Sequence, residues 1–151
     1  MTHLLTGKLR RGIAALAMAA LATTALAVAV LPATAANLLT KATDLPALEL
    51  SAGKAFPTEP MELEAGKYYR WPIRSDGTTE AAVAAPEFFR FIWINEVVIN
   101  EIEVRPLGLH SIEFDDEGEA VLSFVPIRPG TFEYFMPNAP GDAYRGTIIV
   151  K

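Results

Sequence analysis

Few side chains beyond residue 36 can act as metal ligands or nucleophiles. The chain contains no cysteine, and His110 is the only histidine in this part of the sequence. A single imidazole can anchor a metal ion or respond to pH near neutrality. The position of His110 among the small and apolar residues of segment 107–111 is typical of a loop that enters a strand. We therefore interpret His110 as a partly exposed structural residue, while keeping it as a candidate metal ligand.

Acidic residues gather in one short segment, 113–119, which contains Glu113, Asp115, Asp116, Glu117 and Glu119. The segment lacks the Asp-x-Asp-x-Asp-Gly spacing of a calcium loop, and it is typical of a charged turn between two strands. The chain also has no Gly-x-Ser-x-Gly elbow, no phosphate-binding loop and no dinucleotide fingerprint. With no cysteine and one histidine beyond residue 36, the sequence does not favour a hydrolytic triad. We expect a protein that is not an enzyme.

The N-terminus has the features of a secretory signal peptide. A basic cluster precedes an Ala/Leu/Val-rich run from Ile13 to Leu31, and an Ala-x-Ala site ends at Ala35. We expect residues 1–35 to be removed and the protein to be exported to a periplasm. A retained membrane anchor is the alternative, because the apolar run approaches the thickness of a bilayer.

The charge balance of the expected mature segment limits its partners. All 18 acidic residues but only 10 of the 13 basic residues follow residue 36, so the mature segment carries a net charge of −8. An acidic surface disfavours nucleic acid and anionic membranes, and it is compatible with metal ions or cationic protein partners. We therefore expect no nucleic-acid binding, and no membrane association once the signal peptide is removed.

The mature sequence alternates short strand patterns with turn residues. The spacing of strands at intervals of 8 to 12 residues is typical of a β-sandwich or barrel. We expect residues 36–58 to form a linker with an edge strand at Leu48–Leu50, followed by one domain at 59–151. Segment 78–85 contains good helix formers and ends before Pro86, which predicts one short helical insertion. We expect strands at 61–64, 68–73, 89–94, 97–104, 119–125, 131–136 and 146–151.

The C-terminal third resembles the cupredoxin family. Segment 126–135 is similar to the apolar strand, Pro-Gly turn and aromatic strand that precede the family's metal loop. Segment 140–146, which reads Pro-Gly-Asp-Ala-Tyr-Arg-Gly, resembles the family's Pro-Gly-His…Met-x-Gly loop, and 147–150 resembles its closing strand. The resemblance spans about 61–151. It implies an all-β, cupredoxin-like Greek-key β-sandwich with one short helical insertion.

The resemblance also implies which residues occupy the family's blue-copper positions. The cysteine position falls on Met136, the second histidine on Asp142 and the axial methionine on Tyr144. No histidine stands at the first position, and Glu101 is the nearest match. A type 1 copper centre needs a thiolate and two imidazoles. The sequence therefore excludes this kind of electron-transfer site.

Two functions remain open for a cupredoxin-like domain of this kind. The segment Glu101–Val104 is similar to a Glu-Phe-Glu-Val stretch in periplasmic iron-uptake proteins, where a carboxylate replaces the first histidine. The resemblance thus implies an oxygen-rich site of Glu101, Asp142 and Tyr144, to which Met136 adds a thioether, for an iron ion or a copper ion that is not type 1. The alternative is a metal-free sandwich that binds a periplasmic protein partner, for which a contiguous exposed apolar patch would be the mark.

Overall fold

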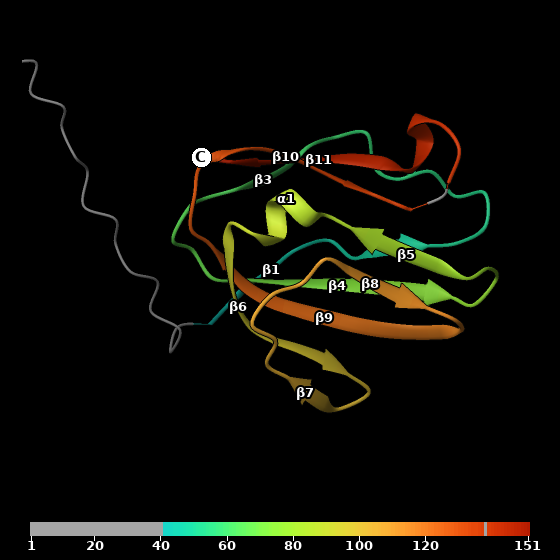
Figure 1. Ribbon diagram of the computed structural model, residues 1–151, viewed down its shortest axis with the longest axis horizontal. Helices are drawn as coiled ribbons and strands as arrows, with labels where there is room; N and C mark the ends of the chain where they lie inside the picture. Colours follow the sequence, from blue (N-terminus) through green and yellow to red (C-terminus); the bar gives the residue numbers. More distant parts are fainter. Residues whose placement is uncertain (1–40, 138) are drawn as a thin grey trace, which may run out of the picture. The chain divides into compact units, whose positions relative to one another are not determined.

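The computed structural model describes residues 41–137 and 139–151, so the expected signal peptide lies outside the described residues. Two β-sheets pack face to face around one apolar core (Figure 1). None of the helices in the described ranges has the length and apolarity needed to cross a membrane. The elements in chain order are β1 (Thr43–Asp44), β2 (Leu48–Leu50), β3 (Met61–Leu63), β4 (Tyr69–Asp76), β5 (Ala81–Ala84), α1 (Pro86–Phe89), β6 (Ile92–Ile99), β7 (Ile102–Val104), β8 (Ser111–Phe114), β9 (Glu117–Pro126), β10 (Gly130–Phe135), the 3-10 helix η1 (Asp142–Tyr144) and β11 (Arg145–Val150).

The first sheet has the strand order β1-β4-β9-β6-β7, and β2 also pairs with β4. The second sheet has the order β3-β11-β10-β5-β8. The long central pairs are antiparallel, whereas β1, β2 and β3 each join their neighbours in parallel. β7 and β8 therefore form free edges of the two sheets. The result confirms the expected all-β sandwich.

The core follows from the period-2 alternation of the strands. In β4 the side chains of Tyr69, Trp71 and Ile73 are buried, while those of Arg70 and Arg74 are exposed. The neighbouring strand β9, which pairs with β4 in the same sheet, is buried on both faces over most of its length. Large aromatic and aliphatic side chains from both sheets thus join one cluster.

The segment before the expected domain takes part in this sandwich. The predicted edge strand at Leu48–Leu50 is confirmed as β2, which pairs with Ile73–Ser75 of β4. Phe56 lies in the core with 3% of its surface exposed. The residues expected to form a linker therefore contribute strands and one core aromatic to the domain.

The helical insertion is present, but the prediction placed it one element too early. Residues 81–84 form strand β5 and pair antiparallel with β8, with Val83 opposite Ile112. The helix is α1, and Pro86, expected to end a helix, instead begins it. Proline suits the first turn because that position needs no backbone donor. The burial of Phe88 and Phe89 anchors the helix to the core.

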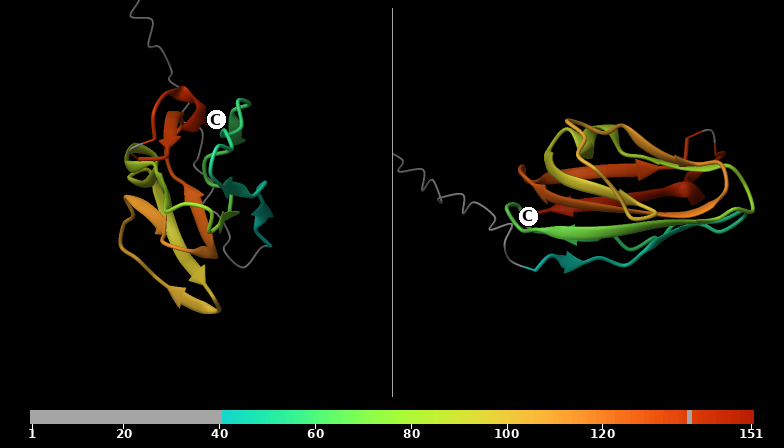
Figure 2. Two further views of the ribbon diagram at one scale, coloured as in Figure 1. Left: turned by 90° about the vertical axis from the view of Figure 1, so that its right-hand side faces the viewer. Right: turned by 90° about the horizontal axis from the view of Figure 1, so that it is seen from below.

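The segment expected as one strand, Val97–Val104, is a hairpin. Asn100 and Glu101 have φ angles of 47° and 67°, and they form a two-residue turn between β6 and β7. Positive φ at both central positions is the conformation of a type I′ turn, whose twist matches antiparallel strands. Glu101 therefore lies in a turn and not in a strand. The hairpin projects beyond the body of the sandwich in two views (Figures 1 and 2).

Candidate functional site

Three of the residues that the resemblance implies lie on the loop between β10 and β11. Met136 directly follows β10, and Asp142 and Tyr144 begin and end η1. The backbone N–H of Met136 donates to the carbonyl oxygen of Tyr144 at 3.0 Å, which closes the loop. The loop thus brings the backbones of Met136 and Tyr144 together.

Tyr144 has a packing role in this loop. Its half-buried ring meets Phe56 edge to face, with centroids 6.2 Å apart, and Phe56 stacks on Tyr134 at 5.5 Å. The N–H of Phe56 also donates to the carbonyl oxygen of Ala143 at 2.8 Å. The residue that the resemblance places at the axial-methionine position is therefore part of an aromatic stack.

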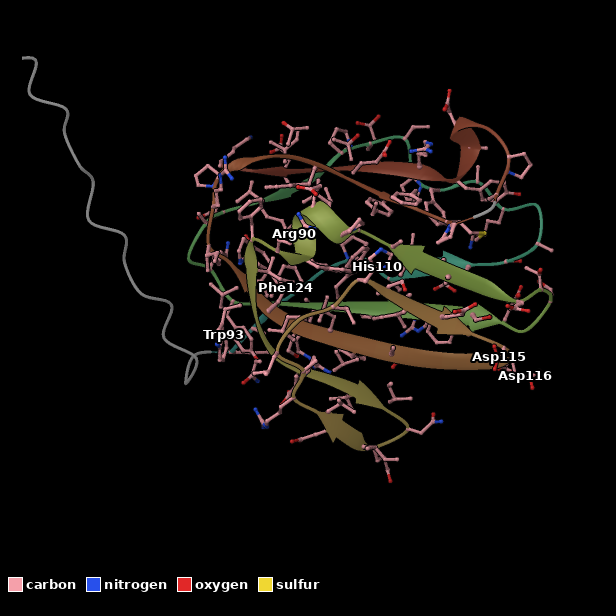
Figure 3. The ribbon with its side chains drawn as sticks, viewed as in Figure 1. Arg90, Trp93, His110, Asp115, Asp116 and Phe124 are labelled. Atoms are coloured by element: carbon pink, nitrogen blue, oxygen red, sulfur yellow. The ribbon has the colours of Figure 1, made fainter. Side chains whose placement is uncertain are left out.

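Asp142 points away from this stack. Its carboxylate is fully exposed, and an oxygen lies 4.0 Å from Nε of Arg145. His110 is also exposed and lies before β8 (Figure 3), where its carbonyl oxygen accepts from the N–H of Ala85 at 3.3 Å. Neither side chain lines the pocket that contains Met136.

Glu101 is not brought to the loop. It occupies the tip of the β6–β7 hairpin, at the edge of the first sheet, whereas η1 belongs to the far side of the second sheet (Figure 1). Because the two places are separated across the sandwich, Glu101 and Asp142 cannot share one ion at bond lengths of about 2.0–2.6 Å. Within residues 41–137 and 139–151, no three His, Cys, Asp or Glu side chains lie close enough to hold a metal ion.

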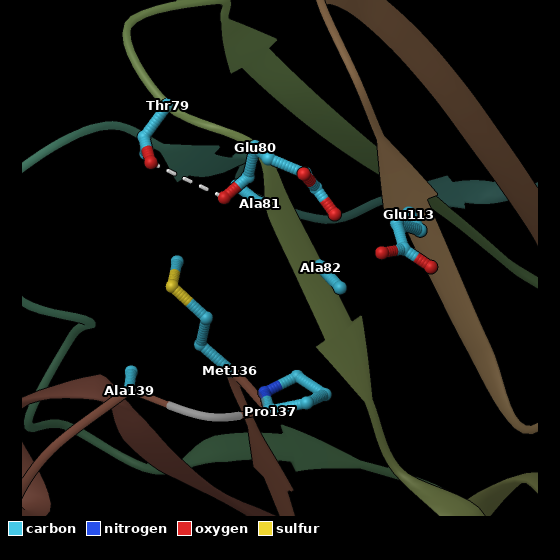
Figure 4. A pocket seen from close by; sticks show the side chains of 8 residues that line it. All are labelled: Thr79, Glu80, Ala81, Ala82, Glu113, Met136, Pro137 and Ala139. Atoms are coloured by element: carbon cyan, nitrogen blue, oxygen red, sulfur yellow. Dashed lines mark hydrogen bonds between the residues drawn. The ribbon is translucent and has the colours of Figure 1, made fainter.

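A pocket of about 350 Å³ opens beside Met136 (Figure 4). The thioether of Met136 enters from one side, and the carboxylates of Glu80 and Glu113 lie on the other. Ala82 pairs with Glu113, so the side chains of these two residues lie on one face of the second sheet. The pocket is open because the alanine side chains that line it are small. The lining residues are Thr79, Glu80, Ala81, Ala82, Glu113, Met136, Pro137 and Ala139.

This donor set does not fit a type 1 copper centre, because it offers neither thiolate nor imidazole. One thioether and two carboxylates are a mixed set of soft and hard donors. Neither Glu80 nor Glu113 is singled out by a sequence motif. They line one pocket with Met136 only because β5 pairs with both β8 and β10.

The turn next to this pocket is held by Asp76. One of its carboxylate oxygens accepts from the N–H and the hydroxyl of Thr78, at 3.0 and 2.6 Å. Hydrogen bonds from Ser51 and Thr78 lower the pKa of Asp76 to about 2. The Thr78 hydroxyl oxygen in turn accepts from the N–H of Ala52 at 2.9 Å. The β4–β5 turn is thereby tied to the segment that follows β2.

A second candidate surface is apolar. Ile99, Ile102 and Val104 lie on one face of the β6–β7 hairpin, because Ile99 pairs with Ile102 and Val104 pairs with the buried Val97. Their exposed fractions are 40%, 65% and 44%. We call these three residues the hairpin patch. Trp93 is also exposed but belongs to the opposite face of β6, as its alternation with the half-buried Ile94 indicates.

Comparison with solved structures agrees with this architecture. A multicopper oxidase superposes with a TM-score of 0.59 at 9% identity over 74% of this chain and 45% of its own. A multi-copper oxidase from Pseudomonas thermotolerans superposes with a TM-score of 0.58 at 14% identity, over 80% of this chain and 32% of its own. A copper nitrite reductase from Nitrosomonas europaea gives 0.50 at 13% identity, over 62% of this chain and 33% of its own. The chain thus spans less than half the length of each.

These similarities define the class of fold. The protein is a cupredoxin-like β-sandwich, and without any cysteine in the chain it lacks the thiolate of a type 1 copper centre. No family model matches the chain, and no curated protein does. At identities of 9% to 14% the likeness concerns the fold, and function has to be inferred from the site.

Proposed function

We propose that this protein is an exported, non-enzymatic cupredoxin-like module that binds a protein partner through the hairpin patch. The observation that carries the proposal is the exposure of Ile99, Ile102 and Val104 side by side on one face of the hairpin. Contiguous apolar surface of this kind marks interaction sites on soluble proteins. Export is inferred from the N-terminal pattern, and the absence of enzymatic activity from the scarcity of catalytic residue types.

The position of the hairpin explains why the patch is available. β7 is the last strand of the first sheet, and the hairpin projects beyond the sandwich body (Figure 2). Val97, nearer the body, is 4% exposed, whereas Ile102 on the same face is 65% exposed. The apolar stripe of the core thus continues past the point where the domain covers it. A partner that covers the patch would extend the core.

Site-specific photo-crosslinking in the native host tests this function. A photoreactive amino acid replaces Ile102 in one variant and Ile127 in the control, because Ile127 is a comparably exposed apolar residue at 60% that lies outside the hairpin. We expect one defined crosslinked product from position 102 and none from position 127, with the partner identified by mass spectrometry. Equal products from both positions, or none from position 102, would contradict the proposal.

A second candidate function is metal handling at the pocket beside Met136. The observation in its favour is that Met136, which the resemblance places at the family's cysteine position, lines one pocket with Glu80 and Glu113. If an ion binds there, Met136 would supply a soft donor and the two glutamates hard donors, which suits a copper or iron ion outside the type 1 class. Metal analysis of the protein purified from its native compartment tests this function.

A further inference from the structure

We propose that the partner binds as an extended strand added to the free edge of β7, and that this strand alternates apolar residues with lysine or arginine. The inference rests on the proposed function of the hairpin patch and names the binding mode and the chemistry of the partner. Three features of the hairpin support it: an open backbone edge, a rigid frame and a distinctive pattern of side chains.

The open edge follows from the register of the hairpin. The turn has two residues, so the backbones of the flanking residues Ile99 and Ile102 are hydrogen-bonded to each other. In the next pair, Val98 and Glu103, the backbone N–H and carbonyl groups point outward, away from the partner strand. The N–H and carbonyl groups of Glu103 therefore point away from β6. Within the described residues no further strand follows β7 in the sheet. One donor and one acceptor are thus presented at the spacing that an added strand needs.

The hairpin is held in place before any partner arrives. Its turn uses positive φ angles at Asn100 and Glu101, which fix the twist of the two strands. Arg105 clamps its base, because its guanidinium donates to Asn95 at 3.1 and 3.2 Å, to Glu96 at 3.2 Å and to Glu103 at 3.3 Å. A preformed edge avoids much of the entropy loss that accompanies strand addition.

The side chains of β7 specify what the added strand should contain. Ile102 and Val104 project to one face and Glu103 to the other, because successive residues of a strand alternate. Apolar residues of the partner would pack beside Ile102 and Val104, and a cation would face the carboxylate of Glu103 across the strands, beside its existing contact with Arg105 at 3.3 Å. Glu101 and the net charge of −8 of residues 37–151 favour a basic segment further.

Charge also argues against a second copy of this chain as the partner. The antiparallel register that joins Ile102 of one copy to Val104 of the other places Glu103 directly opposite Glu103. Like charges in directly opposed positions destabilise a strand pair. A separate protein with a basic, alternating segment satisfies the same edge without this repulsion.

The test uses fluorescein-labelled heptapeptides of alternating lysine and valine, with alternating glutamate and valine as the control peptide. Fluorescence anisotropy measures binding to the wild type, to Glu103→Pro and to Ile102→Ser. Proline removes the outward N–H of residue 103 and the carboxylate that accepts from Arg105, but no backbone hydrogen bond to β6, so the strand pairing of the hairpin tolerates it. We expect Glu103→Pro and the glutamate peptide each to weaken binding at least about tenfold. Hydrogen exchange adds a direct readout, because the Glu103 amide should become protected when the lysine peptide binds.

The outcomes separate this inference from the proposed function. If Ile102→Ser weakens binding while Glu103→Pro does not, and the Glu103 amide stays unprotected, docking on the patch stands and strand addition is wrong. If neither variant changes binding, both proposals fail for this surface. Concentration-dependent dimers of the peptide-free protein in sedimentation, abolished by Glu103→Pro, would overturn the choice of a separate partner. If Glu103→Pro does not fold, Glu103→Lys replaces it and should reverse the preference between the two peptides.

Discussion

The ring of Tyr134 lies directly against the backbone of Gly146, its partner across β10 and β11, so closely that a Cβ atom on the glycine would sit 2.1 Å from Cζ of the tyrosine. Only a residue without a side chain permits this contact. The same ring stacks on Phe56 and meets Trp71 edge to face, at 5.5 Å in each case. Gly146 thereby determines how the aromatic stack beneath the β10–β11 loop is arranged.

We predict that Gly146→Ala destabilises the protein severely. The new methyl group would displace Tyr134, which is 2% exposed and packed on several sides, so overpacking should lower the free energy of unfolding by about 2–4 kcal/mol. Urea unfolding measures the change. Gly108→Ala is the matched control, because a Cβ there meets nothing within 4 Å. A Gly146→Ala variant as stable as the control would show that the ring can move freely.

We predict that Glu101→Gly stabilises the protein. A positive φ is unfavourable for glutamate but not for glycine, and Asn-Gly is the preferred pair for a type I′ turn. The free energy of unfolding should rise by about 0.5 kcal/mol, which thermal unfolding detects as an increase of a few degrees in Tm. Glu103→Gly is the control in the neighbouring strand and should instead be destabilising. If Glu101→Gly removes a bound metal ion from the purified protein, Glu101 is a ligand after all.

We predict that a substitution of Met136, which lines the pocket, changes metal affinity, whereas a substitution of Asp142, which lies outside it, does not. Met136→Leu keeps the volume but removes the thioether, and should weaken any copper-ion affinity at least about tenfold. Asp142→Ala should leave that affinity unchanged, because the carboxylate is fully exposed and does not line the pocket. Equilibrium dialysis with metal quantification measures both. Equal retention of the ion in wild type and Met136→Leu would contradict a metal role for the thioether.

The pKa of Asp76 predicts a specific loss of stability in acid. In the folded protein this pKa is lowered from 3.8 to about 2, so the ionised carboxylate favours the folded state. The contribution is fully present above about pH 4 and is lost as the pH falls toward 2. Urea unfolding between pH 5 and pH 2 should therefore show a steeper decline for the wild type than for Asp76→Asn. Parallel pH profiles of the two proteins would contradict the role of Asp76 in holding the turn.

The local patterns in the sequence were sufficient for most of the strands. The aromatic residues of 68–73 predicted β4, Pro129-Gly130 predicted the turn before β10, and the acidic run predicted the turn between β8 and β9. The prediction from composition misplaced the helix. Alanines are good helix formers in an isolated segment, but in the folded chain residues 81–84 pair with β8 as a strand. The type I′ turn at Asn100 was also missed, since its second residue is glutamate and not the usual glycine.

The sequence by itself determined which residues share the β10–β11 loop, because Met136, Asp142 and Tyr144 are neighbours along the chain, and it excluded a thiolate site because there is no cysteine. Only the tertiary structure decided what these residues face. Tyr144 meets Phe56, Met136 faces Glu80 and Glu113, and Glu101 is carried away on a projecting hairpin. Each of these outcomes depends on pairings between strands far apart in the chain. Such pairings are set by the burial of the whole core, and no local pattern encodes them.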